Sequence, residues 1–328
     1  MKIGKLPEQV LVRSVLRQAG HRREEVLAGP AVGRDCAVVA LDEGEVFVLS
    51  TDPITGTVQD IGSHGIHITA NDLAASGAEP VGVLLTALLP EDICEEQIRE
   101  IMKDAESVCR ELNMEILGGH TEITRAVAQP LLSVTGVGKI SREEQQTVPC
   151  IRPGQDLVVT KWIGLEATAI LAKEREKELL TRFSQDFVRT VQSFGQYISV
   201  VADARAAKAF GAGAMHDITE GGIFGALWEM AEGSGVGLEA DLKAIPIRQE
   251  TVEVCEYFGL NPYQIMSSGS LLIAAEDGPG LVRALEENHI RGTVIGRATE
   301  GPGRILRNGE DIRYLDRPQP DELYKIMG

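Results

Sequence analysis

The chain has 328 residues and carries 32 Lys and Arg against 49 Asp and Glu, which gives a net charge of −17. From Asp35 to Ile98 it contains no Lys or Arg, while acidic residues recur throughout that segment. Nucleic-acid binding depends on basic side chains that displace counterions, so this pattern excludes a nucleic-acid-binding protein. A free anionic ligand is also repelled unless a metal ion intervenes.

The composition, with 43% apolar and 25% charged residues, is that of an ordinary globular protein of about two domains. No stretch approaches the ~20 apolar residues of a membrane span, and the N-terminus has no apolar signal core. The 5 cysteines include no C-x-x-C pair, which argues against a disulfide framework or a zinc site. We therefore expect a cytoplasmic protein with reduced thiols and no membrane partner.

Hydrophobic spacing predicts the elements of the first half in chain order. We expect helices over 8–19, 60–77 and 95–112, and strands over 36–41, 46–50, 81–89, 115–117 and 131–138. The first two strands form a hairpin-like pair. Pro149, Pro153 and Gly154 then break the pattern, so we place a domain boundary there, between domains 1–150 and 151–328.

The second half alternates strands and helices less regularly. We expect strands over 156–160, 236–240, 270–275 and 293–297, a hairpin near 304–314, a loop over 211–219, and helices over 164–180, 184–194, 198–210, 220–233, 250–258 and 279–287. Neither half shows the β-α-β rhythm of a doubly wound sheet. The fold class expected is therefore mixed α/β, of the α+β kind.

Three aspartates, each at the end of an expected element or beside a glycine, form the first candidate site. Asp35 precedes the first strand of the hairpin-like pair, Asp52 follows the second, and Asp72 lies on the next helix beside Asn71. Mg²⁺ prefers oxygen ligands and is often held by a few carboxylates together with substrate phosphates. The alternative is that each Asp is a turn or cap residue.

The second candidate is the run Gly118-Gly119-His120-Thr121-Glu122 after a short strand. A glycine pair lets the backbone approach a ligand closely, and its N–H groups can bind an anion. A tight turn with a surface histidine is the alternative. The run lacks the Lys of a Walker A loop, and no G-x-G-x-x-G follows a strand, so P-loop and Rossmann sites are disfavoured.

The third candidate is the run from Met215 to Gly222 (MHDITEGG), which opens a helix. Gly221 and Gly222 at a helix N-terminus favour an anion site, and Asp217 is either a cap or a ligand contact. The segment Ser267–Ser270 is either a polar turn or a phosphate or amide contact. Lys161, at a strand end in so acidic a chain, is a candidate phosphate contact, although a surface lysine is the simpler alternative.

The order of these motifs resembles the AIR synthetase superfamily over about residues 5–315. The stretches that carry the resemblance are GPAVGRDCAVV, STDP, NDLAASGAEP, LGGHTEIT, DITEGG and SSGSLLIA. Within the superfamily, the stretch MHDITEGGIFGALWEMAEGSGVG and the later CEYFGLNP look most similar to HypE-like hydrogenase-maturation proteins. The resemblance implies an N-terminal domain that pairs with its twin in a homodimer through a shared β-barrel, and a C-terminal α+β domain.

The resemblance also implies roles for individual residues. Asp35, Asp52 and Asp72 fall on positions that hold Mg²⁺ and ATP phosphates. Beside the nucleotide would lie Asn71, Gly118, Gly119 and Thr121. Facing the acceptor substrate would lie Asp217, Gly221 and Gly222. Of these, Asp35, Asp72 and Asp217 would be the catalytic residues.

The implied chemistry is ATP-dependent activation of an amide-type oxygen or another small acceptor by phosphoryl transfer, in which positioned metal ions and donors stabilise the transferring group. HypE carries its reacting thiol on a C-terminal cysteine, whereas the last cysteine here is Cys255. If the chain is complete, it cannot dehydrate a carbamoyl group on its own tail. The alternatives are a non-catalytic nucleotide-binding maturation or scaffold protein with a protein partner, and a purine- or thiamine-pathway enzyme.

Overall fold

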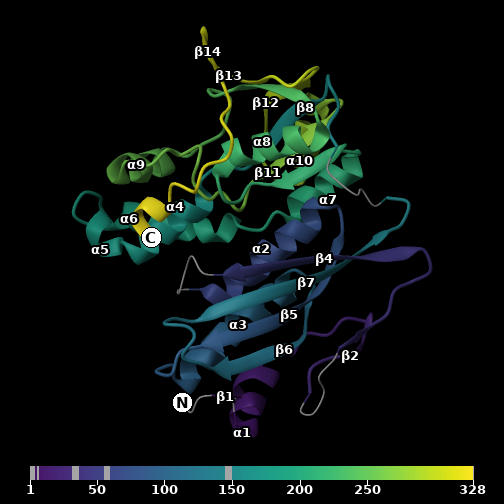
Figure 1. Ribbon diagram of the computed structural model, residues 1–328, viewed down its shortest axis with the longest axis vertical. Helices are drawn as coiled ribbons and strands as arrows, with labels where there is room; N and C mark the ends of the chain where they lie inside the picture. Colours follow the sequence, from purple (N-terminus) through teal and green to yellow (C-terminus); the bar gives the residue numbers. More distant parts are fainter. Residues whose placement is uncertain (1–3, 6, 32–36, 55–59, 145–149, 328) are drawn as a thin grey trace. The chain divides into compact units, whose positions relative to one another are not determined.

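The computed structural model describes residues 4–5, 7–31, 37–54, 60–144 and 150–327 (Figure 1). The chain divides into two compact units. Unit 1 consists of Met1–Ala74 and Ala78–Gln145, and unit 2 consists of Ala75–Gly77 and Gln146–Gly328. Each unit has its own sheet.

Unit 1 is built on a five-stranded sheet with the order β1-β6-β5-β7-β4. Its strands are β1 (Gly4–Lys5), β4 (Glu45–Ile54), β5 (Glu79–Leu89), β6 (Glu115–Ile123) and β7 (Leu131–Ser141). β5 and β6 run parallel, and the other neighbours are antiparallel. Two short strands, β2 (Val26–Ala28) and β3 (Val38–Val39), form a separate ribbon.

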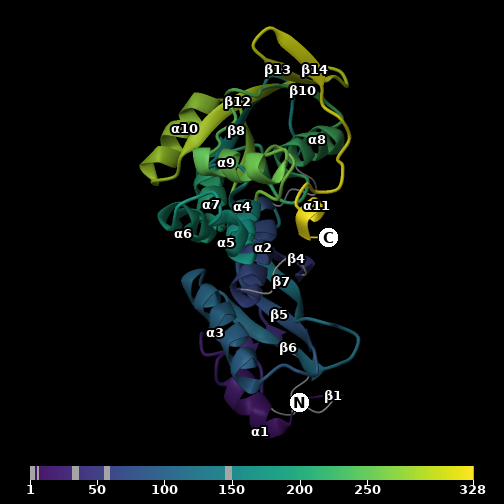
Figure 2. The same cartoon turned by 90° about the vertical axis from the view of Figure 1, so that its left-hand side faces the viewer.

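Helices cover one face of the unit 1 sheet (Figure 2). They are α2 (Ile61–Ala75) and α3 (Glu95–Glu111), while α1 (Glu8–Leu11) continues into a π-helical turn (Val12–Leu16) that packs against α3. α2 and α3 pack very closely, because a Cβ atom at Gly62 would lie 2.2 Å from the Ile101 carbonyl oxygen. On β7 the residues at even positions from Leu132 to Ile140 are buried, as the alternation of a half-covered strand requires.

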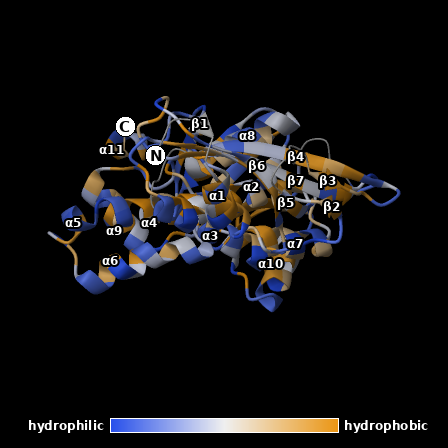
Figure 3. Ribbon diagram, turned by 90° about the horizontal axis from the view of Figure 1, so that it is seen from below, coloured by the Kyte–Doolittle hydropathy of each residue, from blue (hydrophilic) through white to orange (hydrophobic). Residues whose placement is uncertain are grey.

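The opposite face of the unit 1 sheet carries exposed apolar side chains. Leu49 on β4 is 66% exposed, Phe47 on the same strand 43%, and Leu84 on β5 37%. Figure 3 shows hydrophobic residues along β4. We call the face that bears Phe47, Leu49 and Leu84 the open face.

Unit 2 is built on a seven-stranded sheet with the order β14-β13-β10-β12-β8-β11-β9. Its strands are β8 (Asp156–Thr160), β9 (Ala214–Asp217), β10 (Gly237–Asp241), β11 (Leu271–Ala275), β12 (Gly292–Thr299), β13 (Arg304–Asn308) and β14 (Asp311–Tyr314). All neighbours are antiparallel except β10 and β13.

The helices of unit 2 enclose two hydrophobic cores. They are α4 (Leu165–Glu174), α5 (Glu176–Leu179), α6 (Gln185–Gln192), a 3₁₀ turn (Ser193–Tyr197), α7 (Val201–Phe210), α8 (Gly222–Ser234), α9 (Gln249–Phe258), α10 (Gly278–Glu287) and α11 (Tyr324–Met327). One core joins α8 to the sheet through side chains such as Leu227, Leu238 and Leu272. The other joins α4, α6 and α9 to Leu323 of the C-terminal segment.

Three expectations about where the strands lie are wrong. β4 does not end before Thr51-Asp52-Pro53 but runs through them to Ile54. Because β4 lies at the edge of the sheet, the missing N–H of Pro53 is tolerated. β6 likewise continues through Gly118 and Gly119 to Ile123, so this glycine pair is not a turn.

The third wrong expectation is the loop over 211–219, which contains the edge strand β9. A fourth expectation, the hairpin-like pair, is also wrong, because β3 pairs with β2 while β4 pairs with β7. The short elements β1, β2 and α11 were not expected, and the other elements agree with the expected ones apart from a few terminal residues and the divided helix over 164–180. Within the described ranges, every helix is too short or too polar to span a lipid bilayer.

Candidate functional site

Two of the predicted metal ligands in unit 1 meet at the hydroxyl of Ser50. This serine and Asp52 are on β4, and Asp72 is on α2. The Ser50 Oγ donates to Asp72 Oδ2 and lies 3.4 Å from Asp52 Oδ2. Alternation along the strand turns Ser50 and Asp52 toward α2, away from the open face. A strand and a helix therefore bring three oxygen atoms together, and we call this set the Ser50 cluster.

The donor set of the Ser50 cluster fits Mg²⁺. Two partly exposed carboxylates and one hydroxyl are hard oxygen ligands, and Mg²⁺ is usually held by one or two carboxylates together with substrate phosphates and water. Two negative groups this close repel each other, and a divalent cation would relieve that repulsion. No group of three His, Cys, Asp or Glu residues suited to a metal occurs in the parts of the chain that are described. Asp35, the third predicted ligand, lies outside those parts.

The predicted nucleotide residues of unit 1 lie on α2 and β6. Asn71 is fully buried on α2, next to Asp72. On β6, Gly119 pairs with Leu85, which pairs with Val134, which pairs with Asp52, so all four lie in one row across the sheet. Three strand spacings put Gly119 about 14 Å from Asp52. The structure thus brings Asp52 and Asp72 together, while the glycine pair and Thr121 lie farther along the sheet.

Gly119 is required by the backbone itself. Its φ is +142°, and an added Cβ would lie 1.9 Å from the Leu85 carbonyl oxygen. The register between β5 and β6 shifts next to this pair, between Val83 and Leu84. The neighbouring Gly118 has room for a methyl group, since its nearest contact would be a Leu84 side-chain carbon at 3.6 Å. Only the second glycine is therefore demanded by the strand geometry.

In unit 2, the motif that opens α8 is capped by a residue from far along the chain. The N–H of Gly221, the N-cap of α8, donates to Asp321 Oδ2 at 2.8 Å. The N–H of Leu323 donates to Asp321 Oδ1 at 2.9 Å. Asp217, the cap considered from the sequence, does not accept from this N–H. The anion that the glycine pair was expected to attract is, in this structure, a carboxylate of the protein itself.

Asp321 is buried, with only 2% of its surface exposed. Burial raises the pKa of Asp321 to about 6, although the N–H donors from Leu323 and Gly221 act in the opposite direction. The segment around it is tied down further, because the N–H of Glu322 donates to the Gln264 carbonyl and the Leu323 side chain is in the core. We call residues 315–327 the C-terminal strap.

Lys161 has internal partners. Its Nζ donates to the Ser199 carbonyl at 2.6 Å and to Asp203 Oδ2 at 3.0 Å, and Asp203 is only 2% exposed. Burial lowers the pKa of Lys161, while the charge of Asp203 acts to raise it. This geometry favours a structural ion pair within unit 2 over the phosphate contact suggested by its position at a strand end.

The hydroxyls of the Ser267–Ser270 turn have different surroundings. Ser267 Oγ accepts from the Gly164 N–H and donates to the Ile265 carbonyl, both at 2.8 Å. Ser270 Oγ donates to the Trp162 carbonyl. Ser268 Oγ, in contrast, is buried with no hydrogen-bond partner in the described part of the chain. Two of the three serines therefore support the turn.

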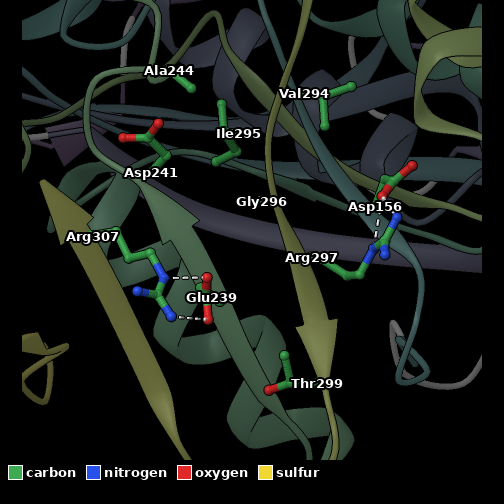
Figure 4. Close-up of a pocket in the computed structure, with 10 residues that line it drawn as sticks. All are labelled: Asp156, Glu239, Asp241, Ala244, Val294, Ile295, Gly296, Arg297, Thr299 and Arg307. Carbon is green, nitrogen blue, oxygen red and sulfur yellow. Dashed lines mark hydrogen bonds and ion pairs between the residues drawn. The ribbon is translucent and has the colours of Figure 1, made fainter. Parts of the chain in front are cut away.

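A hollow of about 520 Å³ lies on the unit 2 sheet, and its charged side chains come from β8, β10, β12 and β13 (Figure 4). Its two arginines are already paired. Arg297 Nη2 lies 2.9 Å from Asp156 Oδ1, and Arg307 Nη2 lies 3.1 Å from Glu239 Oε2. With Asp241 also in its lining, the hollow has no excess positive charge for a phosphate group.

Sequence reasoning missed several residues of these sites. Ser50 stands in the S-T-D-P motif beside Asp52, so its place in that motif was the signal for it. His216, which contacts both Asp217 and Glu229, is in the MHDITEGG run and was not assigned a role. Asp321 gave no signal, because nothing local links position 321 to Gly221.

Both halves of the chain match models of known protein families. Residues 33–140 match the AIR synthase related protein, N-terminal domain, and residues 152–307 match the AIR synthase related protein, C-terminal domain. A putative hydrogenase expression/formation protein of Methanocaldococcus jannaschii is 28% identical over 302 residues, covering 89% of this chain and 88% of the relative. Carbamoyl dehydratase HypE of Cupriavidus necator is 28% identical over 286 residues, covering 84% and 78%.

Solved structures share the fold. The E. coli hydrogenase maturation protein HypE gives a TM-score of 0.80 at 22% identity, covering 97% of this chain and 99% of that one. A HypE in complex with ATP gives 0.77 at 19% identity, covering 98% and 97%. A chain of a HypE–HypF complex gives 0.73 at 19% identity, covering 85% and 92%. The expected mixed α/β two-domain fold is confirmed.

Proposed function

Because the chain belongs to the AIR synthase related proteins in both of its halves, we propose that it is an ATP- and Mg²⁺-dependent enzyme that activates an amide-type or other small acceptor by phosphoryl transfer. The observation that carries the proposal is the Ser50 cluster, in which Asp52 and Asp72 converge on one hydroxyl. In so acidic a chain, carboxylates placed this way favour a cation-dependent phosphate site.

The residues of unit 1 have different roles in binding Mg²⁺ and the phosphate groups. Asp52 and Asp72 would hold Mg²⁺, which when bound neutralises charge on the phosphate groups. Ser50 lies between the two carboxylates, with its hydroxyl donating to Asp72 and lying 3.4 Å from Asp52 Oδ2. Gly119 lies at the other end of the same row, where its backbone packs directly against that of Leu85. Positioning and charge stabilisation are most of what phosphoryl transfer asks of a protein.

The similarity to HypE supports the choice of acceptor. The Cupriavidus necator relative is a carbamoyl dehydratase, and a carbamoyl group presents an amide-type oxygen. The solved HypE with ATP supports ATP as the phosphoryl donor. We infer that Asp217 faces the acceptor from unit 2, where Gly221 and Gly222 of the same motif open α8 and the Gly221 N–H is held by Asp321. Lys161 is left out of this assignment because its ammonium is bound by Asp203.

Titration calorimetry with ATP and Mg²⁺ tests the proposal. We expect the wild type to bind ATP with Mg²⁺ and to lose that affinity on chelation. Asp72→Asn should weaken binding at least about tenfold, since it removes one of the two metal-binding carboxylates. The control is Asp42→Asn, which removes an exposed turn carboxylate from the same basic-free segment. Equal ATP binding with and without Mg²⁺ would contradict the metal assignment, and no binding by the wild type would contradict the function.

Protein partners form part of the proposal. We infer that the open face of unit 1 pairs with the same face of a second copy, because exposed Leu49, Phe47 and Leu84 lie on one side of one sheet. The solved HypE–HypF complex supports a maturation-protein partner as well.

A cytoplasmic location agrees with the four free cysteines of the described residues, Cys94, Cys109, Cys150 and Cys255. Burial raises the pKa of the Cys255 thiol to about 12, so this thiol is not a nucleophile.

A scaffold protein that only binds nucleotide is the competing function. The two are separated by steady release of ADP from ATP in the presence of Mg²⁺ and a carbamoyl-bearing acceptor. We expect sustained turnover that stops on chelation. ATP binding without any turnover over a range of such acceptors would favour the scaffold.

A further inference from the structure

A histidine lies between two carboxylates at the end of β9 in unit 2. His216 Nε2 donates to Glu229 Oε2 on α8 at 2.9 Å. On its other side, His216 Nδ1 lies 3.9 Å from Asp217 Oδ1. The second distance is too long for a hydrogen bond but falls within the range of an ion pair. The imidazole ring therefore joins the motif residue Asp217 to the helix that the motif opens.

The strand geometry explains why the ring reaches α8. His216 pairs with Leu272 on β11, and Leu272 belongs to the core that α8 forms with the sheet. Its neighbour Asp217 is the last residue of β9 and pairs with Leu271. Consecutive residues of a strand point to opposite faces, so an ion pair between them depends on the chain turning where β9 ends.

The two carboxylates decide the charge of the ring. Burial acts to lower the pKa of His216, but the interactions with Asp217 and Glu229 outweigh it and raise the pKa to about 9. Those two charges come from β9 and α8, and β11 presents the apolar Leu272. His216 is therefore an imidazolium at neutral pH, with one N–H held by Glu229 and the other directed at Asp217.

One carboxylate oxygen of Asp217 is not hydrogen-bonded by any of the residues that the structure describes. The residue is only 6% exposed, and its Oδ2 has no hydrogen-bond partner in the described part of the chain. A buried carboxylate oxygen without a donor is unfavourable, so it calls for an N–H or O–H group from a ligand or water. Oδ1 faces the imidazolium, and Oδ2 is left for that contact.

We propose that His216 is a positioning residue that holds the Asp217 carboxylate, so that Asp217 Oδ2 accepts a hydrogen bond from an N–H or O–H group of the acceptor. The inference rests on the proposed function for the identity of the ligand. Glu229 holds the ring through the hydrogen bond to Nε2, and the positively charged ring lies beside the Asp217 carboxylate. His216 itself touches no substrate and keeps its proton throughout.

Nuclear magnetic resonance of the histidine rings tests the arrangement without any activity. We expect the His216 ring to titrate near pH 9 in the wild type. Glu229→Gln and Asp217→Asn should each lower that midpoint by about 1 pH unit or more, because each removes one of the two carboxylates. A midpoint that Glu229→Gln lowers and Asp217→Asn leaves unchanged would overturn the proposal, since His216 would then belong to α8 alone.

Turnover of ATP with Mg²⁺ and a carbamoyl-bearing acceptor provides the second readout. In the wild type we expect activity to fall above about pH 9, as His216 loses its proton. His216→Gln should lower kcat about tenfold and abolish that alkaline limb. His216→Lys, which keeps a positive charge, should restore part of the activity and move the limb to higher pH. The exposed His289→Asn is the control and should match the wild type.

The two measurements distinguish failure of the proposed function from failure of the inference about His216. A wild type that shows no turnover would overturn the proposed function, and the ring titration would still decide the inference about His216. An alkaline limb that persists unchanged in His216→Gln would overturn the inference and leave the proposed function standing.

Discussion

Two adjacent glycines, Gly118 and Gly119, make different demands on their strand. Gly119 has a positive φ, and a Cβ there would lie 1.9 Å from the Leu85 carbonyl oxygen. A Cβ atom added at Gly118 would lie 3.6 Å from a Leu84 side-chain carbon, which is an ordinary van der Waals contact. The glycine that the backbone requires is thus the one whose row leads across the sheet to Asp52.

This difference predicts the outcome of a pair of alanine substitutions. Gly119→Ala should lower the free energy of unfolding by about 3 kcal/mol, because it combines a strained φ with a clash against backbone. Gly118→Ala should change it by less than about 0.5 kcal/mol. Urea unfolding followed by circular dichroism measures both. Similar losses in the two variants would show that the register of β5 and β6 differs from the one described.

At the level of elements, α8 depends on a segment that lies about a hundred positions further along the chain. The Asp321 carboxylate accepts from the N–H groups of Gly221 and Leu323, and the rest of the C-terminal strap packs into the core through Leu323. The strap therefore adds to the backbone hydrogen bonds that hold the motif and the start of α8, such as Ile218 N–H to the Ser270 carbonyl and Phe224 N–H to the Tyr263 carbonyl.

The buried Asp321 predicts a particular dependence of stability on pH. Its pKa is raised to about 6 in the folded protein, above the value of an exposed Asp, so the stability from this group is present below about pH 4 and is lost as the pH rises through 6. The advantage of the wild type over Asp321→Asn should therefore shrink by about 2 kcal/mol between pH 4.5 and pH 7.5. Urea unfolding at the two pH values measures it.

Asp277→Asn is the matched control for this prediction. Asp277 caps α10 by accepting from the Gly280 N–H, but its side chain is 60% exposed. Burial raises the pKa of Asp321, so replacing the exposed Asp277 should not reproduce the pH dependence of stability expected for Asp321→Asn. A difference between wild type and Asp321→Asn that is the same at both pH values would contradict that account.

Hydrophobic periodicity predicted most elements, because Val, Ile and Leu repeat with the period of the helix or strand that buries them. It failed where local signals competed. Pro53 suggested that a strand had ended, yet an edge strand accepts proline, and the glycine pair suggested a turn where the strand only shifts register. The short strand β9 was read as a loop because its four residues precede a glycine-rich motif.

The candidate site was predictable only in part. Asp52 and Asp72 could be named from their motifs, but their meeting at Ser50 depends on how α2 packs on β4, which spacing does not show. The Asp321 cap joins residues 100 positions apart, and the Glu229 contact joins a strand to the helix that follows it. Contacts of this kind arise from tertiary packing and leave no local pattern.

For the whole molecule, the charge of −17 bears on the proposed pairing of two copies through the open face. Copies this negative repel one another over the Debye length, so association requires an apolar contact that outweighs the repulsion. Leu49, at 66% exposed, is the most exposed large apolar side chain of β4 and belongs to that face.

Size-exclusion chromatography with light scattering checks this account. We expect the wild type to have the mass of two chains and Leu49→Lys to have the mass of one, because a buried unpaired charge at an interface is strongly unfavourable. Lysine makes the chain less negative, so added repulsion cannot explain the loss. Ile312→Lys, which changes a 57% exposed apolar residue of unit 2, should remain a dimer. Dissociation of both variants alike would contradict the assignment to the open face.

Strand β4 has two different neighbours on its two sides. Ser50 and Asp52 point toward α2, while Leu49 and Phe47 point to the open face, and one backbone carries both sets. A shift of this strand along its length is thus transmitted to the carboxylates and to the apolar contact at once. If the proposed cation site and the proposed dimer contact are coupled through β4, thermodynamic reciprocity requires cation binding to change the affinity between copies by the same factor by which pairing changes the affinity for the cation.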